Sequence, residues 1–142
     1  MLIGLDPILS PELLATLRMM GHGDDIAIVD GNYPAEDHGT RVIRADGHGL
    51  IPILEAVLTL LPIDDSDDAI TRAVNCHTPD QADPIHNDMM KSCAKAGYDG
   101  RVKTAAPDVF YQRVKSSFAV VATSEKQLFG NVILKKGVIR GE

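Results

Sequence analysis

The sequence predicts an α/β protein: a single three-layer α/β/α domain, residues 1–142, with a mostly parallel or mixed sheet. Short β-branched apolar runs alternate with segments that carry helix signals, which is typical of a sheet covered by helices. The length of 142 residues favours one domain, and 44% of them are apolar. A chain of this size and composition can bury a core without disulfides or structural metals.

The first helix has clear signals at both ends. Ser10 is suited to cap the N-terminus, Pro11 fits the first helical position, and Glu12 is favourable in the first turn. Apolar residues then recur at helical spacing, at Leu13, Leu14, Leu17 and Met20. We expect the helix to end at Gly21, as a left-handed residue after the C-terminus.

The remaining elements follow in alternation. We expect strands at residues 26–29, 41–45, 69–74, 101–105, 118–123 and 132–134. We expect a buried helix from Leu50 to Leu61, stopped by Pro62, and another that Asp83-Pro84 opens and Gly97 closes. Asp108 is expected to cap a short helix that runs to Lys115. Turns are expected at residues 31–34 and 135–137, and the acidic residues 64–68 at a solvated loop.

Composition excludes several classes of function. Fourteen basic against twenty acidic residues give a net charge of −6, which disfavours binding to nucleic acids or anionic membranes. Aromatic residues make up 4% of the chain, too few for a platform that stacks bases. The N-terminus does not resemble a signal peptide, and two cysteines do not form a disulfide framework. We therefore expect a cytoplasmic protein with reduced thiols.

His22 and Asp30 are the first candidate catalytic residues. His22 lies between Gly21 and Gly23, so its ring is open to a cavity, and histidine is well matched to proton transfer near neutral pH. The strand at 26–29 carries Asp30 to the carboxyl edge of the sheet, where ligands of α/β sheets bind. Two structural alternatives remain open: His22 as a cation at the end of the first helix, and Asp30 as the acceptor of an Asx turn.

A second candidate group lies near the C-terminus. Gly130 allows close approach of the backbone, and Asn131 offers both a donor and an acceptor. Phe129 can cover the apolar face of a sugar, while Tyr111 can bind a ligand hydroxyl through its phenol. The structural alternatives are a hairpin turn at residues 128–131 and a partly buried packing role for Tyr111.

Metal and nucleotide sites have weaker signals. The sequence contains no phosphate-binding glycine loop, no dinucleotide fingerprint and no nucleophile elbow. Zinc ligands of the right type occur at positions that fit no compact zinc motif: Cys76, His77, His86 and Cys93. A catalytic metal held by His22, His38 and His48 is a further alternative. We expect neither of these metal sites to form.

Taken together, these segments resemble the RbsD/FucU family, which contains fucose mutarotase and ribose pyranase, and the fucose branch more closely. The resemblance covers nearly the whole chain. Its carriers are residues 9–14, Met20-Gly21-His22-Gly23-Asp24, Asp30 with Tyr33-Pro34, 42–47, Phe110-Tyr111, 118–121 and 130–138.

The resemblance implies a three-layer α/β fold, a ring-shaped homo-oligomer that is typically a decamer, and a sugar site at the subunit boundary. It also implies no metal and no organic cofactor. It implies that His22 is the catalytic acid, that Asp30 contacts the sugar or orients the histidine, and that the Phe129–Asn131 loop lines the pocket. Two positions depart from the family. Phe129 stands where tyrosine is usual, and Ala106-Pro107-Asp108-Val109 lacks an arginine that the fucose branch tends to carry.

The expected reaction interconverts the anomers of a reducing monosaccharide, L-fucose or a related aldose, and possibly its pyranose and furanose forms. Ring opening needs one proton delivered to the ring oxygen and one removed from the anomeric hydroxyl, so an acid–base pair is sufficient. Competing classes are a non-catalytic monosaccharide-binding or regulatory oligomer and a metal-dependent isomerase.

Overall fold

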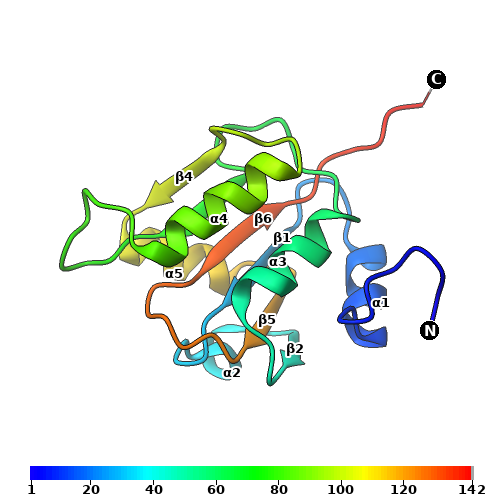
Figure 1. The fold of residues 1–142 in the computed structure, drawn as a ribbon, viewed down its shortest axis with the longest axis horizontal. Helices are drawn as coiled ribbons and strands as arrows, with labels where there is room; N and C mark the ends of the chain where they lie inside the picture. The colour runs from blue at the N-terminus through cyan, green and yellow to red at the C-terminus, as the bar shows by residue number, and fades with distance from the viewer. Residues whose placement is uncertain (142) are drawn as a thin grey trace.

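One six-stranded mixed sheet forms the centre of the molecule (Figure 1). The computed structural model describes residues 1–141. The strand order is β2-β5-β1-β6-β3-β4, and only β6 runs against its neighbours. The strands are β1 (Asp25–Val29), β2 (Val42–Ala45), β3 (Ile70–Ala73), β4 (Val102–Ala105), β5 (Ala119–Thr123) and β6 (Val132–Lys135). All six expected strands are therefore present, with ends shifted by at most one residue.

Helices cover both faces of this sheet, as Figure 1 shows. One apolar cluster joins it to α1 (Pro11–Met19), α3 (Leu50–Leu58) and α4 (Pro84–Lys95). On the opposite face, Phe110 and Val114 of α5 (Pro107–Lys115) and Ala35 of α2 (Ala35–His38) pack on β1 and β5. The predicted layered α/β architecture is confirmed.

The first helix begins as expected and ends differently. Ser10 Oγ accepts the backbone N–H of Leu13 at 3.2 Å, which confirms the cap. The prediction for Gly21 is wrong: the chain leaves the helix through an extended Met20, and Gly21 has no positive φ. Lys136 Nζ donates to the carbonyls of Leu17 and Met20 at 2.8 and 2.7 Å. That lysine, rather than His22, provides the cation at the C-terminus of α1.

Three other boundaries differ from expectation. The α3 helix ends at Leu58 instead of Leu61, because the hydrogen bonds of the next residues form tighter turns before Pro62. Ala106 occupies the cap position of α5, so Asp108 lies inside the first turn. The four-residue helix α2 has no counterpart in the sequence prediction, because Pro34 and its neighbours indicated only a turn. Gly97, with a φ of 99°, does close α4.

Candidate functional site

Asp30 and Asn131 meet at the carboxyl edge of the sheet. Asp30 directly follows β1, and Asn131 directly precedes β6. Because β6 is antiparallel to β1, its beginning lies beside the end of β1. The Asn131 side-chain oxygen accepts the backbone N–H of Asp30 at 2.7 Å, and both residues are buried. Two site residues that are 101 positions apart in the sequence are thus in direct contact.

One oxygen of the Asp30 carboxyl accepts a hydrogen bond within the turn that follows β1. Its Oδ1 accepts the backbone N–H of Asn32 at 2.9 Å, which is the Asx turn that the sequence left as an alternative. Burial raises the pKa of Asp30 above its usual value, and hydrogen bonds, first among them that from Asn32, oppose the rise. The turn uses Oδ1 of this carboxyl, so the turn and a role at a ligand are compatible.

The loop before Asn131 is held in an unusual conformation. Phe129 has a φ of 61°, in the left-handed region that non-glycine residues rarely adopt. Gly130 is closely packed: a Cβ there would lie 3.1 Å from the carbonyl oxygen of Gln127. Both features are maintained by contacts around the loop.

His86 is the principal contact that holds this loop. Its ring is fully buried, and Nε2 donates to the carbonyl of Phe129 at 2.9 Å. Nδ1 accepts the backbone N–H of Asp83 at 3.0 Å and faces Arg72 Nη1 at 3.2 Å. Nδ1 therefore carries no proton, and burial lowers the pKa of His86, which keeps the ring neutral. In the sequence His86 stands out only as a candidate zinc ligand, because no local pattern links it to a loop 43 positions away.

A cluster of three rings lies on the other side of Asp30. Tyr33 forms a hydrogen bond of 2.8 Å with His38 Nδ1. The Tyr111 ring lies 5.8 Å from that of Tyr33 and 5.4 Å from that of His38, edge to face. A hollow of about 340 Å³ beside it is lined by Asp30, Tyr33, Arg44 and Thr123, among others. The half-exposed Tyr111 thus joins the neighbourhood of Asp30 through Tyr33.

His22 lies at the opposite edge of the sheet. Gly23 donates to the carbonyl of Lys136 at 2.8 Å, which fixes the turn, and the imidazole is exposed. Its Nε2 is 3.0 Å from Asp64 Oδ1. Hydrogen bonds from Ser66 and His22 lower the pKa of Asp64 to about 2, so this carboxylate is ionised at neutral pH. Asp64 was predicted only as part of a solvated loop, and its pairing with His22 was missed.

The strand β1 separates the two halves of the predicted site. His22 precedes β1 and Asp30 follows it, and a five-residue strand spans roughly 15 Å. Within one chain, Asp30 does not contact His22; Asp64 takes the place of its charged partner. A hollow of about 520 Å³ next to His22 is lined by Ile63, Asp64, Asp65, Val138 and Arg140.

The metal-binding alternatives find no support in the geometry. Across residues 1–141, no group of three or more His, Cys, Asp or Glu side chains is arranged to hold a metal ion. Cys93 is buried in the core while Cys76 is exposed, and His38 is engaged by Tyr33. In the same range, no helix is long and apolar enough to cross a membrane.

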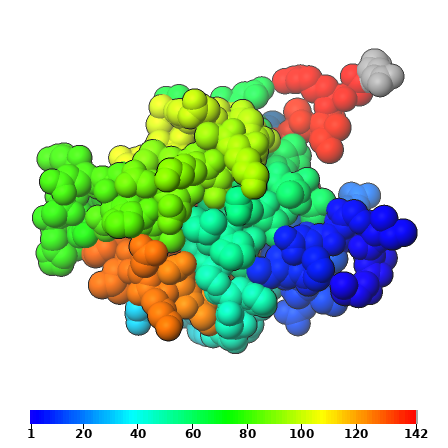
Figure 2. All heavy atoms as spheres, in the orientation of Figure 1, coloured from blue at the N-terminus to red at the C-terminus, as the bar shows by residue number. Residues whose placement is uncertain are grey.

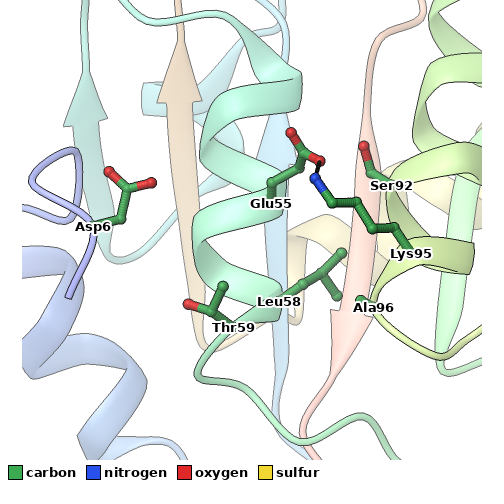
Figure 3. Close-up of a pocket in the computed structure, with 7 residues that line it drawn as sticks. All are labelled: Asp6, Glu55, Leu58, Thr59, Ser92, Lys95 and Ala96. Carbon is green, nitrogen blue, oxygen red and sulfur yellow. Dashed lines mark ion pairs between the residues drawn. The ribbon is translucent and has the colours of Figure 1, made fainter. Parts of the chain in front are cut away.

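Another hollow, of about 470 Å³, opens between α3 and α4 (Figure 3). Glu55 and Lys95 form an ion pair of 3.8 Å across it. It contains none of the predicted site residues, so the carboxyl edge and the His22 edge remain the candidate regions.

Comparison with known proteins places the chain in a family. A model of the RbsD / FucU transport protein family matches residues 3–139. The chain belongs to this family. The fucose mutarotase of Danio rerio is 40% identical over 147 residues, covering 98% of this chain and 95% of the relative. The L-fucose mutarotase of Actinobacillus pleuropneumoniae serotype 5b is 37% identical over 140 residues, covering 97% of each chain.

A solved structure extends this similarity to the fold. The crystal structure of the fucose mutarotase from Streptococcus pneumoniae, in complex with L-fucose, superimposes with a TM-score of 0.91 at 35% sequence identity. The match covers 98% of this chain and 100% of that one. This chain is therefore similar over nearly its whole length to enzymes of the isomerase class that are named for sugar mutarotation.

Proposed function

We propose that this family member is a sugar mutarotase that acts on L-fucose or a related aldose. The observation that carries the proposal is the buried Asp30 carboxyl, held next to the Asn131 amide at the carboxyl edge of the sheet. A carboxyl with a raised pKa and a neighbouring amide can bind sugar hydroxyls and exchange a proton with one of them. The names of the relatives support the reaction.

The acid in the proposed reaction is His22. Protonated His22 donates to the ring oxygen, and Asp64, whose pKa is lowered by its hydrogen bonds, stabilises the imidazolium as an anion at neutral pH. The anomeric hydroxyl gives its proton to water or to Tyr111, while the backbone of Asn131, which is not basic enough to take the proton, can only hold the sugar by hydrogen bonds. The carbonyl then accepts the returning hydroxyl on either face, which yields the second anomer.

The separation of His22 from Asp30 leads us to place the site between two copies of the chain. The resemblance to the family implies a ring-shaped oligomer with the sugar at the subunit boundary. Exposed apolar residues around the His22 edge support a contact there, because Leu60, Val138 and Ile139 are 38%, 47% and 85% exposed. Figure 2 shows the C-terminal residues projecting from the body of the molecule.

Exchange NMR tests the activity directly. Wild-type protein is expected to accelerate anomer exchange of L-fucose above the buffer rate, with D-ribose measured in parallel. His22→Ala is expected to lower the catalysed rate by about 10²–10⁴-fold, the usual contribution of a general acid. His48→Ala, at an exposed histidine, is the matched control. A wild type that binds the sugar but leaves its exchange at the buffer rate would show a binding protein instead.

A mixing experiment tests the shared site. The variants His22→Ala and Asp30→Asn are each expected to be inactive alone. The two variants are then unfolded, mixed and refolded together. If each site of the ring takes His22 from one subunit and Asp30 from its neighbour, about a quarter of the sites in the mixed ring contain both intact residues. Recovery of activity in the mixture supports the boundary site, and no recovery in a mixed assembly places both halves within one chain.

A further inference from the structure

Arg72 is a buried cation that forms no salt bridge with residues 1–141, although the charge of the more distant Asp83 acts on it. Its relative exposure is 7%, and its Nη1 donates to the carbonyl of Ala73 at 2.9 Å and to the neutral His86 ring at 3.2 Å. No carboxylate of residues 1–141 lies within 4.0 Å of its guanidinium. A charge in this position is costly unless a partner neutralises it.

Arg113, in the same molecule, is an arginine whose charge is paired with a carboxylate. Its side chain is 16% exposed, and it forms two hydrogen bonds with Asp25, at 2.9 and 3.1 Å. Arg72 has no such pair. Its Nε and Nη2 make no hydrogen bond with residues 1–141, and neither atom is sealed from solvent. Two donors of a planar fork are therefore available to a ligand.

The position of Arg72 connects it to the candidate sugar site. In the sheet, Arg72 pairs with Val132 of β6, and the N–H of the next residue, Ala73, donates to the carbonyl of Asn131 at 3.0 Å. The guanidinium contacts His86, and His86 in turn holds the carbonyl of Phe129. Arg72 is thus linked on two sides to the loop that precedes β6.

We propose that Arg72 binds a carboxylate of the substrate, so that this site acts faster on a uronic acid than on the neutral aldose of the same configuration. This rests on the proposed mutarotase function and narrows its substrate class. A carboxylate matches the planar fork and the single positive charge. A phosphate dianion fits less well, because Asp83 adds negative charge nearby and no second cation of residues 1–141 contacts Arg72.

The test compares matched sugars on the wild-type protein by exchange NMR. D-galacturonate and D-galactose differ at C6, and so do D-glucuronate and D-glucose, with L-fucose as reference. The catalysed exchange per unit concentration is expected to be at least about tenfold faster for each uronate than for its neutral partner, the scale of a charge-assisted hydrogen bond. D-galactose 6-phosphate separates carboxylate from phosphate recognition.

Substitutions attribute the preference to Arg72. Arg72→Met keeps an unbranched apolar stem, removes a costly buried charge, and is expected to abolish the uronate-to-neutral ratio. Arg18→Met, at an exposed arginine on α1, makes the same charge change and is expected to keep the wild-type ratio. Calorimetric titration of wild type with D-galacturonate and D-galactose checks the preference in binding alone.

The outcomes separate the two proposals. Equal rates on uronates and neutral sugars, or faster exchange of the phosphate, overturn the role of Arg72 but leave the mutarotase standing. An unchanged ratio in Arg72→Met also overturns it. No catalysed exchange of any sugar overturns the proposed function itself, and the calorimetric comparison then decides whether Arg72 selects a bound carboxylate.

Discussion

At both edges of the sheet, the candidate residues are held by hydrogen-bond partners that are distant in the sequence. Asp64 is 42 positions from His22, and His86 is 43 positions from Phe129. Each partner makes a local hydrogen bond as well, Asp64 with the N–H of Ser66 and His86 with the N–H of Asp83, so the long-range contact is an addition to a local role. Outer contacts of this kind fix the tautomer and orientation of a functional side chain.

Asp64→Asn tests the pairing with His22. The amide keeps the shape but removes the charge that stabilises imidazolium, so we expect catalysed exchange to fall by about 10–100-fold. Asp67→Asn, at an exposed residue of the same acidic segment, is the control and is expected to keep wild-type rates. Equal rates in both variants would show that His22 acts without Asp64.

His86 makes stability depend on pH. Its folded-state pKa lies below its unfolded value, so the stabilisation is complete above pH 6.5 and is lost as pH falls through the folded pKa. His86→Gln keeps a donor for the Phe129 carbonyl without a titrating ring. We expect the difference in unfolding free energy between wild type and variant to shrink below pH 6.5, by at most about 1.4 kcal/mol per pH unit. Urea titrations across that range measure it, and a constant difference would contradict the assignment.

Residue-level prediction succeeded where the signal was local. The Ser10 cap and the presence of a loop at residues 129–131 could be predicted from neighbouring residues. The predicted end of β1 placed Asp30 at the carboxyl edge of the sheet, where the structure has it. Asp64, His86 and Arg72 were missed because their partners arrive only through tertiary folding. Their residue types alone do not distinguish them from solvated or core positions.

At the level of elements, alternation of apolar runs was sufficient to locate every strand. The unpredicted reversal of β6 is what brings Asn131 to Asp30, since parallel entry would place the beginning of β6 at the other edge. Helix ends were predicted less well, because contacts from elsewhere in the fold can cap a helix. At the C-terminus of α1, the Lys136 side chain caps the last carbonyls where a glycine was expected.

The tight loop before β6 gives a prediction at this scale. Gly130→Ala places a methyl group 3.1 Å from the Gln127 carbonyl, so the loop must shift. We expect a loss of about 1–3 kcal/mol in unfolding free energy by urea denaturation, as for other overpacked sites. Gly141→Ala, where a Cβ meets open space, is the control. Equal stability of the two variants would show that the loop yields without cost.

For the whole molecule, the edge that bears His22 is expected to join another copy. Ile139, which is 85% exposed, lines an apolar hollow with Leu14, Leu17 and Leu61. Ile139→Asp places a charge there, and we expect a smaller assembly by light scattering together with slower sugar exchange. Ile139→Leu keeps the apolar contact and is expected to resemble wild type. A dissociated but fully active variant would contradict a site shared between chains.

One consequence follows from the course of β6. Its N-terminal end adjoins Asn131, and the residue after its C-terminal end, Lys136, receives the N–H of the glycine beside His22. A slip of β6 along its neighbours would displace both halves of the proposed site, His22 at one end and Asn131 at the other, at once. A substitution that shifts β6 to adjust one half of the proposed site is therefore expected to alter the geometry of the other half as well.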